Sequence, residues 1–515
     1  MYFIKRIVKL ERFATACAVF CAAVCVVFLF ALSGPSFILS RRDLSGQSVA
    51  LRDFPYPYGA MVALVNDCDN TTLRSFERYH RFINTREPTI YGEGLGLDVS
   101  DSFFMYTAAA DYNLVMTYFL GADPNSIKDA RLIERYIRCG WIDTLHTYGD
   151  FSAAPVDGTS SESAAAGASA EPAATATAES APPVAAGAPA AGAPSLFSRE
   201  LAVDAYLNLF RDGLFPIVWT DHGNEGNAQN FGSYGIETSA KYKRGDAPNS
   251  GAYYHADVTL AGGVKYIWDA RRSNRFGSAF PLAARTLRDG RKLWSFGRYT
   301  GSGKDGVIWD WYPDRLRGIL TEERLSELVT KRQYGMFAQH LGYYGEDYRM
   351  DPKDIDALRL LADYQYERNA ILVAGTARLL EYATANAFVN YTASISVDSR
   401  NDSHGDSLTD SNAETLTDTL ADTLDDSLND SLNDSRVDID ITAIGDPLFP
   451  EPSPALDRLR GLTFYCDEPD KARILIRGTP IDEREIARNP PDETGRPSIS
   501  IKWHEPDATD YTRYG

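Results

Sequence analysis

The chain has 515 residues, of which 44% are hydrophobic and 12% aromatic, so it is long enough for two to three domains with sizeable cores. Its formal net charge is −19, and the sequence contains no basic cluster that would favour nucleic acid as a partner. The negative charge is concentrated, because residues 401–440 hold twelve acidic residues and one arginine and so contribute 1 − 12 = −11.

An apolar segment near the start of the chain predicts a membrane anchor. Phe13 to Leu32 is a run of twenty residues without a charge, which is the length that a helix needs to cross a bilayer. Four basic residues precede it and two follow it, a distribution that favours a cytoplasmic N-terminus. We therefore expect residues 1–45 to anchor the protein in the lipid bilayer as a transmembrane helix, with the body periplasmic or at the cell surface. The tripeptide Ala31–Ser33 leaves signal-peptide cleavage as the alternative.

Three of the six cysteines lie outside this segment, at Cys68, Cys139 and Cys466. In an oxidising compartment two of them could form a disulfide, and three buried thiols are the other interpretation. The sequence contains no Cys-x-x-Cys pair, so neither a zinc knuckle nor a thioredoxin-like site is indicated.

From residue 50 to 386 the sequence repeats one unit, a short apolar run followed by a cluster of Asp, His or Asn. Between several of these runs the pattern predicts helices, which open at Asp123-Pro124, at Ser198 and at Thr321. Strands that alternate with helices predict a parallel sheet, and seven repeats predict a seven-stranded β/α barrel. The seven expected strands are GAMVALVNDCDN (59–70), GLGLDVSD (94–101), CGWIDTLHTYGD (139–150), LFPIVWTDHGN (214–224), GVKYIWDA (263–270), KLWSFGRY (292–299) and QYGMFAQHLG (333–342).

Residues 152–195 interrupt this pattern. They contain 18 alanines in 44 residues, together with Pro, Gly and Ser, and their only larger aliphatic residues are two valines. Such a composition cannot form a packed core, so we interpret the segment as a flexible insertion in the barrel.

After a long helical stretch at about 354–385, the pattern changes to alternating apolar and polar residues, which predicts a small antiparallel β domain over 387–515. Within it, residues 407–438 divide into eight acidic tetrads such as SLND. Weak calcium binding is conceivable, but the glycine of known calcium loops is missing. We therefore expect a solvated acidic loop, inserted at about 399–437 at the tip of a hairpin.

Acids and histidines stand at the ends of four expected strands, where chemistry gathers in β/α barrels. These residues are Asp67 and Asp69, His146 and Asp150, Asp221 and His222, and His340. A zinc-type catalytic centre needs three protein ligands and an open position for water, and a further carboxylate could act as the base. The spacing of His146 and Asp150 alone decides nothing, because composition predicts about one such pair by chance.

The segments LVNDCDN, HTYGD and FAQH together resemble the polysaccharide deacetylases, metal-dependent hydrolases that remove acetyl groups from glycans. The resemblance covers about residues 59–345 and implies that an acetylated polysaccharide is the substrate. It also implies that Asp67 is the base, that His340 is the acid, and that a divalent metal ion is bound by Asp69, His146 and Asp150.

The sequence departs from the family pattern in three places. The first motif is Asp-Cys-Asp rather than two adjacent aspartates, and no counterpart of the family's Arg-Pro-Pro-Tyr segment is found. Asp150 replaces the second histidine, which makes the ligand set harder, so manganese or magnesium becomes an alternative to zinc. His222 is a competing third ligand, and Asp221 and His255 are candidates for ligand or substrate binding.

Two other functions remain open from the sequence. One is a glycoside hydrolase on the same barrel, which would use paired carboxylates such as Asp67 and Asp221 without a metal ion. The other is a non-catalytic membrane protein that binds surface polysaccharide through its β domain.

Overall fold

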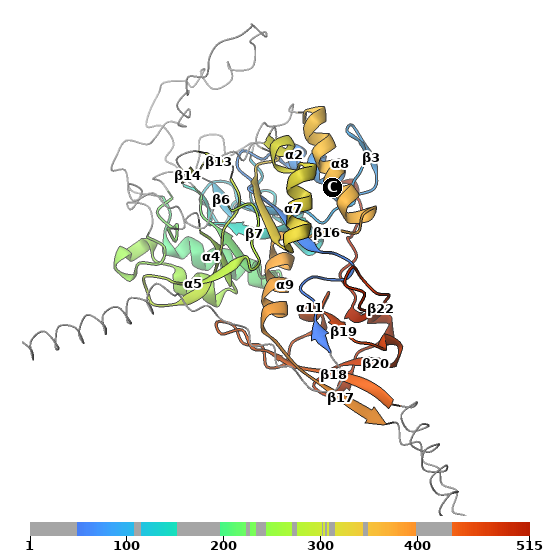
Figure 1. Cartoon of the computed structure of the whole chain (residues 1–515). Helices are drawn as coiled ribbons and strands as arrows, with labels where there is room; N and C mark the ends of the chain where they lie inside the picture. Colours follow the sequence, from blue (N-terminus) through green and yellow to red (C-terminus); the bar gives the residue numbers. More distant parts are fainter. Residues whose placement is uncertain are drawn as a thin grey trace, which may run out of the picture. The chain divides into compact units, whose positions relative to one another are not determined.

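The central sheet is organised around strand β2 (Ala60–Asn66), whose seven residues are all buried. A continuous apolar run of this kind is typical of a parallel strand that is covered on both faces. The computed structural model (Figure 1) describes residues 49–107, 115–151, 196–222, 227–232, 244–269, 275–300, 302–303, 306–307, 315–342, 349–397 and 435–514. All of these belong to the compact unit from Gln47 to Gly515.

Six of the seven predicted runs contain a strand of this sheet, whereas the seventh strand, β5, overlaps its predicted run (94–101) only at Asp101. Each of the seven strands forms parallel pairs with its neighbours. The strand order is β12-β10-β9-β7-β5-β2-β15. Besides β2, the members are β5 (Asp101–Phe103), β7 (Ile142–His146), β9 (Val218–Thr220), β10 (Tyr266–Trp268), β12 (Lys292–Phe296) and β15 (Tyr334–Gln339).

The two ends of this parallel run meet at one bridge. Tyr299, just beyond β12, pairs in parallel with Phe337 of β15. Its N–H donates to the carbonyl of Met336 at 2.7 Å, and the N–H of Ala338 donates to its carbonyl at 3.0 Å. The same sheet also contains the antiparallel strand β11 (Leu282–Thr286) and the branch strand β16. The mixed α/β fold is therefore confirmed, whereas the predicted seven-stranded barrel is not.

Helices lie between the strands, and two of them begin where the sequence predicts. Ser198 precedes α4, and the hydroxyl of Thr321 accepts a hydrogen bond at the start of α7. The helix expected at Asp123-Pro124 begins later, because α3 starts after Asp129. Among the described residues before 350, the α-helices are α2 (Leu73–Asn84), α3 (Ala130–Arg138), α4 (Arg199–Arg211), α5 (Ala256–Ala261), α6 (Leu316–Ile319) and α7 (Glu322–Lys331).

The single long helical stretch expected at 354–385 is wrong. The structure has α8 (Pro352–Tyr366), the short strand β16 (Ile371–Val373) and α9 (Thr376–Phe388). The reason is that Asn369 adopts a left-handed conformation, with φ of 51°, and ends the helical path. The apolar residues that follow then pair in parallel with the first half of β2.

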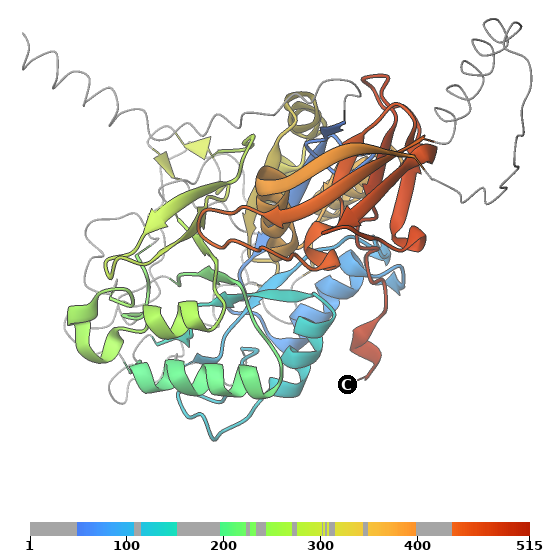
Figure 2. The same ribbon diagram turned by 90° about the horizontal axis from the view of Figure 1, so that it is seen from below.

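The C-terminal region forms two four-stranded sheets (Figure 2). One pairs β17 (Val389–Val397), β18 (Ser435–Ile444), β20 (Ala472–Ile476) and β21 (Thr479–Pro480), and its β18–β20 pair is parallel, so this region is not purely antiparallel as predicted. The other pairs β1 (Ala50–Leu51), β19 (Thr463–Tyr465), β23 (Ser498–Ile501) and β22 (Ile486–Asn489).

The first strand of the described chain is fixed by a buried arginine. Arg52, only 1% exposed, follows β1 and donates to the carbonyls of Phe54 and Pro55 at 2.9 and 3.1 Å. Its Nε also donates to Asp492 at 3.1 Å. The N-terminal strand is thereby attached to the C-terminal sheet.

Alternate residues of the central strands pack into two different cores. Val62 and Leu64 of β2 belong to a core that also contains side chains of α2, α3, α4, α7 and α8. Helices α2, α3 and α4 lie together in Figure 2. Met61, Ala63 and Val65 pack with α9 and the C-terminal strands. Because side chains alternate along a strand, the two faces of the sheet are both covered.

Several predicted features lie outside the described residues, namely the anchor at 1–45, the alanine-rich segment 152–195 and most of the acidic repeat. The last acidic tetrad, 435–438, was predicted as part of the loop but instead begins strand β18. Val397 pairs with Ser435, so the acidic insertion does join two paired strands. Among the described residues no helix has the length and hydropathy to cross a membrane. Cys68, Cys139 and Cys466 are all free thiols.

Candidate metal centre

Five of the predicted site residues gather at one edge of the sheet. Asp67 and Asp69 follow β2, His146 is the last residue of β7, His222 follows β9, and His340 follows β15. The carboxyl ends of parallel strands all meet at this edge, so residues far apart in the sequence become neighbours.

Asp69, His146 and His222 form a group that could hold a metal ion, with ligand atoms that all lie within 4.8 Å of one another. The Oδ1 atom of Asp69 lies 3.0 Å from Nδ1 of His222 and 3.7 Å from Nδ1 of His146. Two ligand atoms on one zinc ion at tetrahedral angles lie about 3.4 Å apart. This Oδ1 is also buried and accepts no hydrogen bond of regular geometry within the described part of the chain. Two imidazoles and one carboxylate therefore fit a divalent metal ion.

His146 is buried between an aromatic ring and several polar groups. Its ring stacks on Phe104 with the ring centres 4.9 Å apart, and its Nδ1 lies 3.3 Å from the hydroxyl of Ser102. The thiol of Cys68 lies 3.7 Å from the same nitrogen. Burial lowers the pKa of His146 to about 4, so the imidazole is neutral near pH 7, which is the form that binds metals.

A second group of possible ligands contains Asp69 together with Asp67, the predicted base, and His340, the predicted acid. Asp67, Asp69 and His340 also offer ligand atoms within 4.8 Å of one another. Nε2 of His340 lies 2.7 Å from Oδ2 of Asp69 and 3.9 Å from Oδ2 of Asp67. Asp69 thus faces the two imidazoles with one oxygen and His340 with the other.

Asp67 is paired with an arginine that sequence reasoning missed. Nη1 of Arg298 donates to Oδ1 of Asp67 at 2.8 Å, and Nη2 lies 2.6 Å from Oδ2. The guanidinium lies over the ring of Trp268, 4.1 Å from its centre. Burial would raise the pKa of Asp67, but the charge and hydrogen bond of Arg298, together with His146 and His340, outweigh it and hold that pKa below its ordinary value. Asp67 is therefore a carboxylate that a fixed cation orients.

A signal for Arg298 was present in the sequence. It lies in the run KLWSFGRY and continues the alternation of Trp294 and Phe296, both buried on the same face of β12. A basic residue at that position of a strand end points to the same edge as Asp67.

Asp150 does not belong to either metal-holding group of the described residues. Its Oδ2 lies 3.6 Å from Nε2 of His222, and the amide of Asn227 donates to its Oδ1 at 3.4 Å. Burial would lower the pKa of His222, but the carboxylates of Asp69 and Asp150 raise it well above the ordinary value. A carboxylate behind a ligating histidine fixes the orientation of its ring. The geometry therefore favours the alternative in which His222 is the third ligand.

Asp221 also lies outside these groups. Its Oδ1 accepts hydrogen bonds from Nε1 of Trp219 at 2.8 Å and from the N–H of Phe231 at 3.0 Å. These bonds join the end of β9 to the segment 227–232, so the observed contacts of Asp221 are with the surrounding protein.

His255, another candidate, is a fully buried core histidine. Its Nδ1 lies 2.8 Å from the hydroxyl of Thr259, and its Nε2 lies 2.6 Å from the carbonyl of Gln229. Burial lowers its pKa to about 4. With protein partners on both nitrogens, this ring has no nitrogen left for a metal ion.

Asn66 connects the first site strand to the segment that carries His340. Its Oδ1 accepts from the N–H of Leu341 at 2.7 Å, and its Nδ2 donates to Oδ2 of Asp101 at 2.7 Å. All three groups are buried. The position of His340 relative to Asp67 and Asp69 is therefore fixed by hydrogen bonds beneath the site.

Comparison of the chain with protein-family models, with curated proteins and with solved structures gives no match.

Proposed function

We propose that this chain is a metal-dependent hydrolase that removes acetyl groups from an extracytoplasmic polysaccharide. The observation that carries the proposal is the convergence of Asp69, His146 and His222 beside the Asp67–Arg298 pair and His340. This arrangement supplies three ligands, a base and an acid at one edge of a sheet. The resemblance of the sequence motifs to polysaccharide deacetylases supports acetylated glycans as the substrate class.

The ligand set supports zinc as the metal. Two imidazoles and one carboxylate match the ligands of catalytic zinc sites, whereas magnesium and manganese prefer oxygen ligands. When bound, the metal ion would supply a water molecule of lowered pKa and a positive charge near the oxygen of the acetyl carbonyl.

The side chains of this chain would perform the proton transfers. Asp67, ionised beside Arg298, accepts a proton from the attacking water. His340 donates a proton to the leaving oxygen or nitrogen of the sugar, and Asp69 Oδ2, at 2.7 Å, holds its ring in place. Because Arg298 donates a hydrogen bond to Oδ1 of Asp67 and forms an ion pair with Oδ2, the carboxylate has one preferred orientation toward the substrate.

The finer fold and the location are part of the same proposal. The bridge between Tyr299 and Phe337 supports closure of the seven parallel strands into a barrel. The uncharged segment Phe13 to Leu32 supports attachment to a membrane, with the site outside the cytoplasm.

The test is metal content together with acetate release, measured on the purified full chain with acetylated chitin oligomers and acetylated xylan. We expect about one zinc per chain and acetate release that stops with chelator and returns with zinc. Asp67→Asn should keep the metal and lose acetate release by about a hundredfold or more. Asp482→Asn, at an exposed position, is the matched control. Release of reducing ends that is insensitive to chelator would contradict the proposal and favour a glycoside hydrolase.

A further inference from the structure

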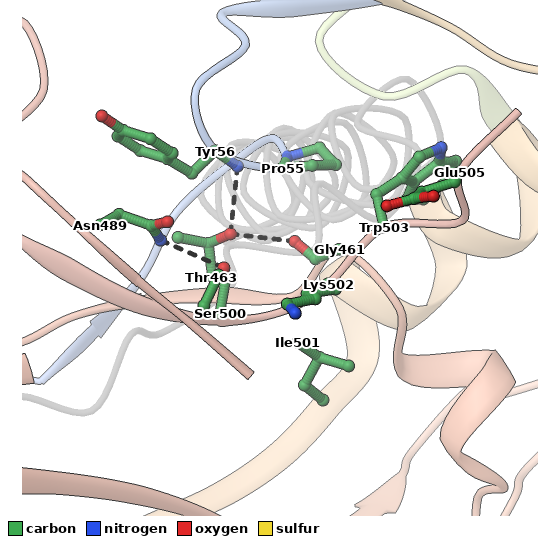
Figure 3. A pocket seen from close by; sticks show the side chains of 11 residues that line it. Pro55, Tyr56, Gly461, Thr463, Asn489, Ser500, Ile501, Lys502, Trp503 and Glu505 are labelled. Carbon is green, nitrogen blue, oxygen red and sulfur yellow. Dashed lines mark hydrogen bonds between the residues drawn. The ribbon is translucent and has the colours of Figure 1, made fainter. Parts of the chain in front are cut away.

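A cavity of about 180 Å³ is lined by residues of the segment before β2 and of the C-terminal region (Figure 3). Tyr56, in the segment before β2, forms one wall, and residues of β19, β22 and β23 form the others. Asp67 follows the other end of β2, and a strand of this length spans about 20 Å. The cavity is therefore separate from the site at the strand ends.

The floor of the cavity contains an amide with an unused acceptor. Asn489 is 7% exposed, and its Nδ2 donates to the hydroxyls of Ser498 and Ser500, each at 3.1 Å. Within the described part of the chain its Oδ1 accepts no hydrogen bond. The hydroxyl of Ser500, which accepts from Asn489, donates to no group of the described residues. Figure 3 shows Asn489 and Ser500 joined at this wall. The side-chain oxygen of Asn489 thus lies next to an available donor.

The rim adds two charged groups and two aromatic rings. Lys502 and Glu505 are exposed, and neither forms an ion pair with another described residue. The rings of Tyr56 and Trp503 are partly buried. The indole of Trp503 is held by the ring of Tyr382, whose centre lies 5.7 Å away.

These groups define the chemistry of the ligand. Neighbouring donors and acceptors suit hydroxyl groups, because each hydroxyl both donates and accepts. The aromatic walls suit the apolar face of a sugar ring. The volume is below the range of about 300–1,000 Å³ that drug-sized ligands occupy, so one ring fits better than an oligomer.

We propose that this cavity binds one pyranose ring of a glycan chain, as a holding site separate from the metal centre. The choice of a glycan rests on the proposed function, since a polysaccharide substrate would supply further rings along the same polymer. Lys502 and Ser500 donate to sugar oxygens, and Asn489 accepts from a sugar hydroxyl. Binding at both places would keep the polymer on the protein between successive reactions.

The experiment is calorimetric titration of the full chain, stripped of metal with a chelator, with the tetramers of N-acetylglucosamine and of glucose. We expect saturable binding of at least one tetramer at one site per chain. Ser500→Ala and Lys502→Ala should each weaken it about fivefold or more, because each removes one hydrogen bond to the sugar. Lys471→Ala, at a partly exposed lysine elsewhere in the same region, should bind as the unmodified chain does.

Two results would overturn the holding site. One is that neither tetramer binds up to about 10 mM. The other is binding that neither Ser500→Ala nor Lys502→Ala weakens, while thermal melting shows that both variants are folded. Because the titration uses metal-free protein, it is independent of the test of the proposed function. An absence of tetramer binding would not alter the measured metal content or acetate release. Loss of acetate release, in turn, does not change the titration.

Discussion

Asp69 is the residue on which the two halves of the candidate site depend. Its Oδ1 faces His146 and His222, and its Oδ2 lies 2.7 Å from His340. One carboxylate therefore sets the distance between the metal ligands and the acid. This double role explains why burial, which would raise its pKa, is outweighed by the histidines, so that the pKa of Asp69 lies well below its ordinary value.

The identity of the third ligand is testable with two alanine variants. His222→Ala removes a ligand atom, so we expect it to abolish stoichiometric metal binding. Asp150→Ala removes only the carboxylate behind His222, so it should keep the metal and lower its affinity about 10–100-fold. Competition with a chromogenic chelator measures both affinities. Equal losses in the two variants would restore Asp150 as a ligand, the assignment that the family resemblance implied.

A second prediction at the residue scale concerns stability and His255. The folded-state pKa is about 4 against an ordinary value of 6.5, so the unfolded chain binds more protons between these values. The contribution of neutral His255 to the free energy of unfolding is therefore complete above pH 6.5 and is lost as the pH falls toward 4. The change is about 3 kcal/mol over that window.

Urea unfolding of the full chain and of His255→Gln, between pH 7 and pH 4, measures this contribution. The variant should lose about 3 kcal/mol less than the unmodified chain over this range, since glutamine does not titrate there. All other titrating groups are common to both proteins and cancel in the comparison. Parallel pH curves for the two proteins would show that His255 does not contribute.

At the scale of elements, six of the seven apolar runs predict the parallel strands well, because a strand buried on both faces must be apolar throughout. The exception is β5, which begins only at Asp101, the last residue of its predicted run. β16 was missed for a physical reason. Its three apolar residues lie between two helical patterns, and periodicity alone does not distinguish a short buried strand from a buried turn of helix. Pairing with β2, a contact distant in sequence, decides its conformation.

The bridge between β12 and β15 gives a prediction about closure of the sheet. Tyr299→Pro removes the N–H that donates to Met336 and leaves a buried carbonyl without its partner. We expect the free energy of unfolding to fall by about 3 kcal/mol. Tyr299→Phe keeps this bond and loses only the contact of the hydroxyl with Arg324, so it should fall by about 1 kcal/mol. Equal effects of both variants in urea unfolding would show that the bridge adds nothing.

The candidate site was predictable in part. The sequence places five candidate residues at the ends of predicted strands, and the structure brings these five together. They are Asp67, Asp69, His146, His222 and His340. The sequence does not show whether Asp150 or His222 is the third metal ligand. Asp150 follows His146 by four residues, but this spacing does not determine how the chain turns after β7. That turn depends on the hydrogen bond from the N–H of Thr147 to the carbonyl of Thr220 in β9 and on bonds from the segment 227–232.

At the scale of the whole molecule, the two ends of the alanine-rich segment lie close together. Phe151 and Phe197 are in ring contact, with centres 5.4 Å apart. The N–H of Phe151 also donates to Asn227 at 2.8 Å, so this end is fixed by residues outside the segment. A short connection could therefore replace residues 152–195 without moving either end.

We expect the full chain with 152–195 replaced by a short Gly-Ser linker to keep its stability within about 1 kcal/mol, since shortening a flexible loop changes its closure entropy little. Urea unfolding compares it with the unmodified chain. Failure to obtain soluble folded protein would contradict this prediction. Metal content serves as the internal control, because Asp150 stands next to the deleted residues and close to His222.

The pairing of β1 with β19 has a mechanical consequence. Any pull on the chain ahead of residue 49 enters the folded body at Ala50 and Leu51, which are paired with the C-terminal sheet. The hydrogen bonds of Arg52 to Asp492 and to the carbonyls of Phe54 and Pro55 then resist this force. Because β2 begins only at Ala60, the strand that positions Asp67 and Asp69 is shielded from tension until this attachment breaks.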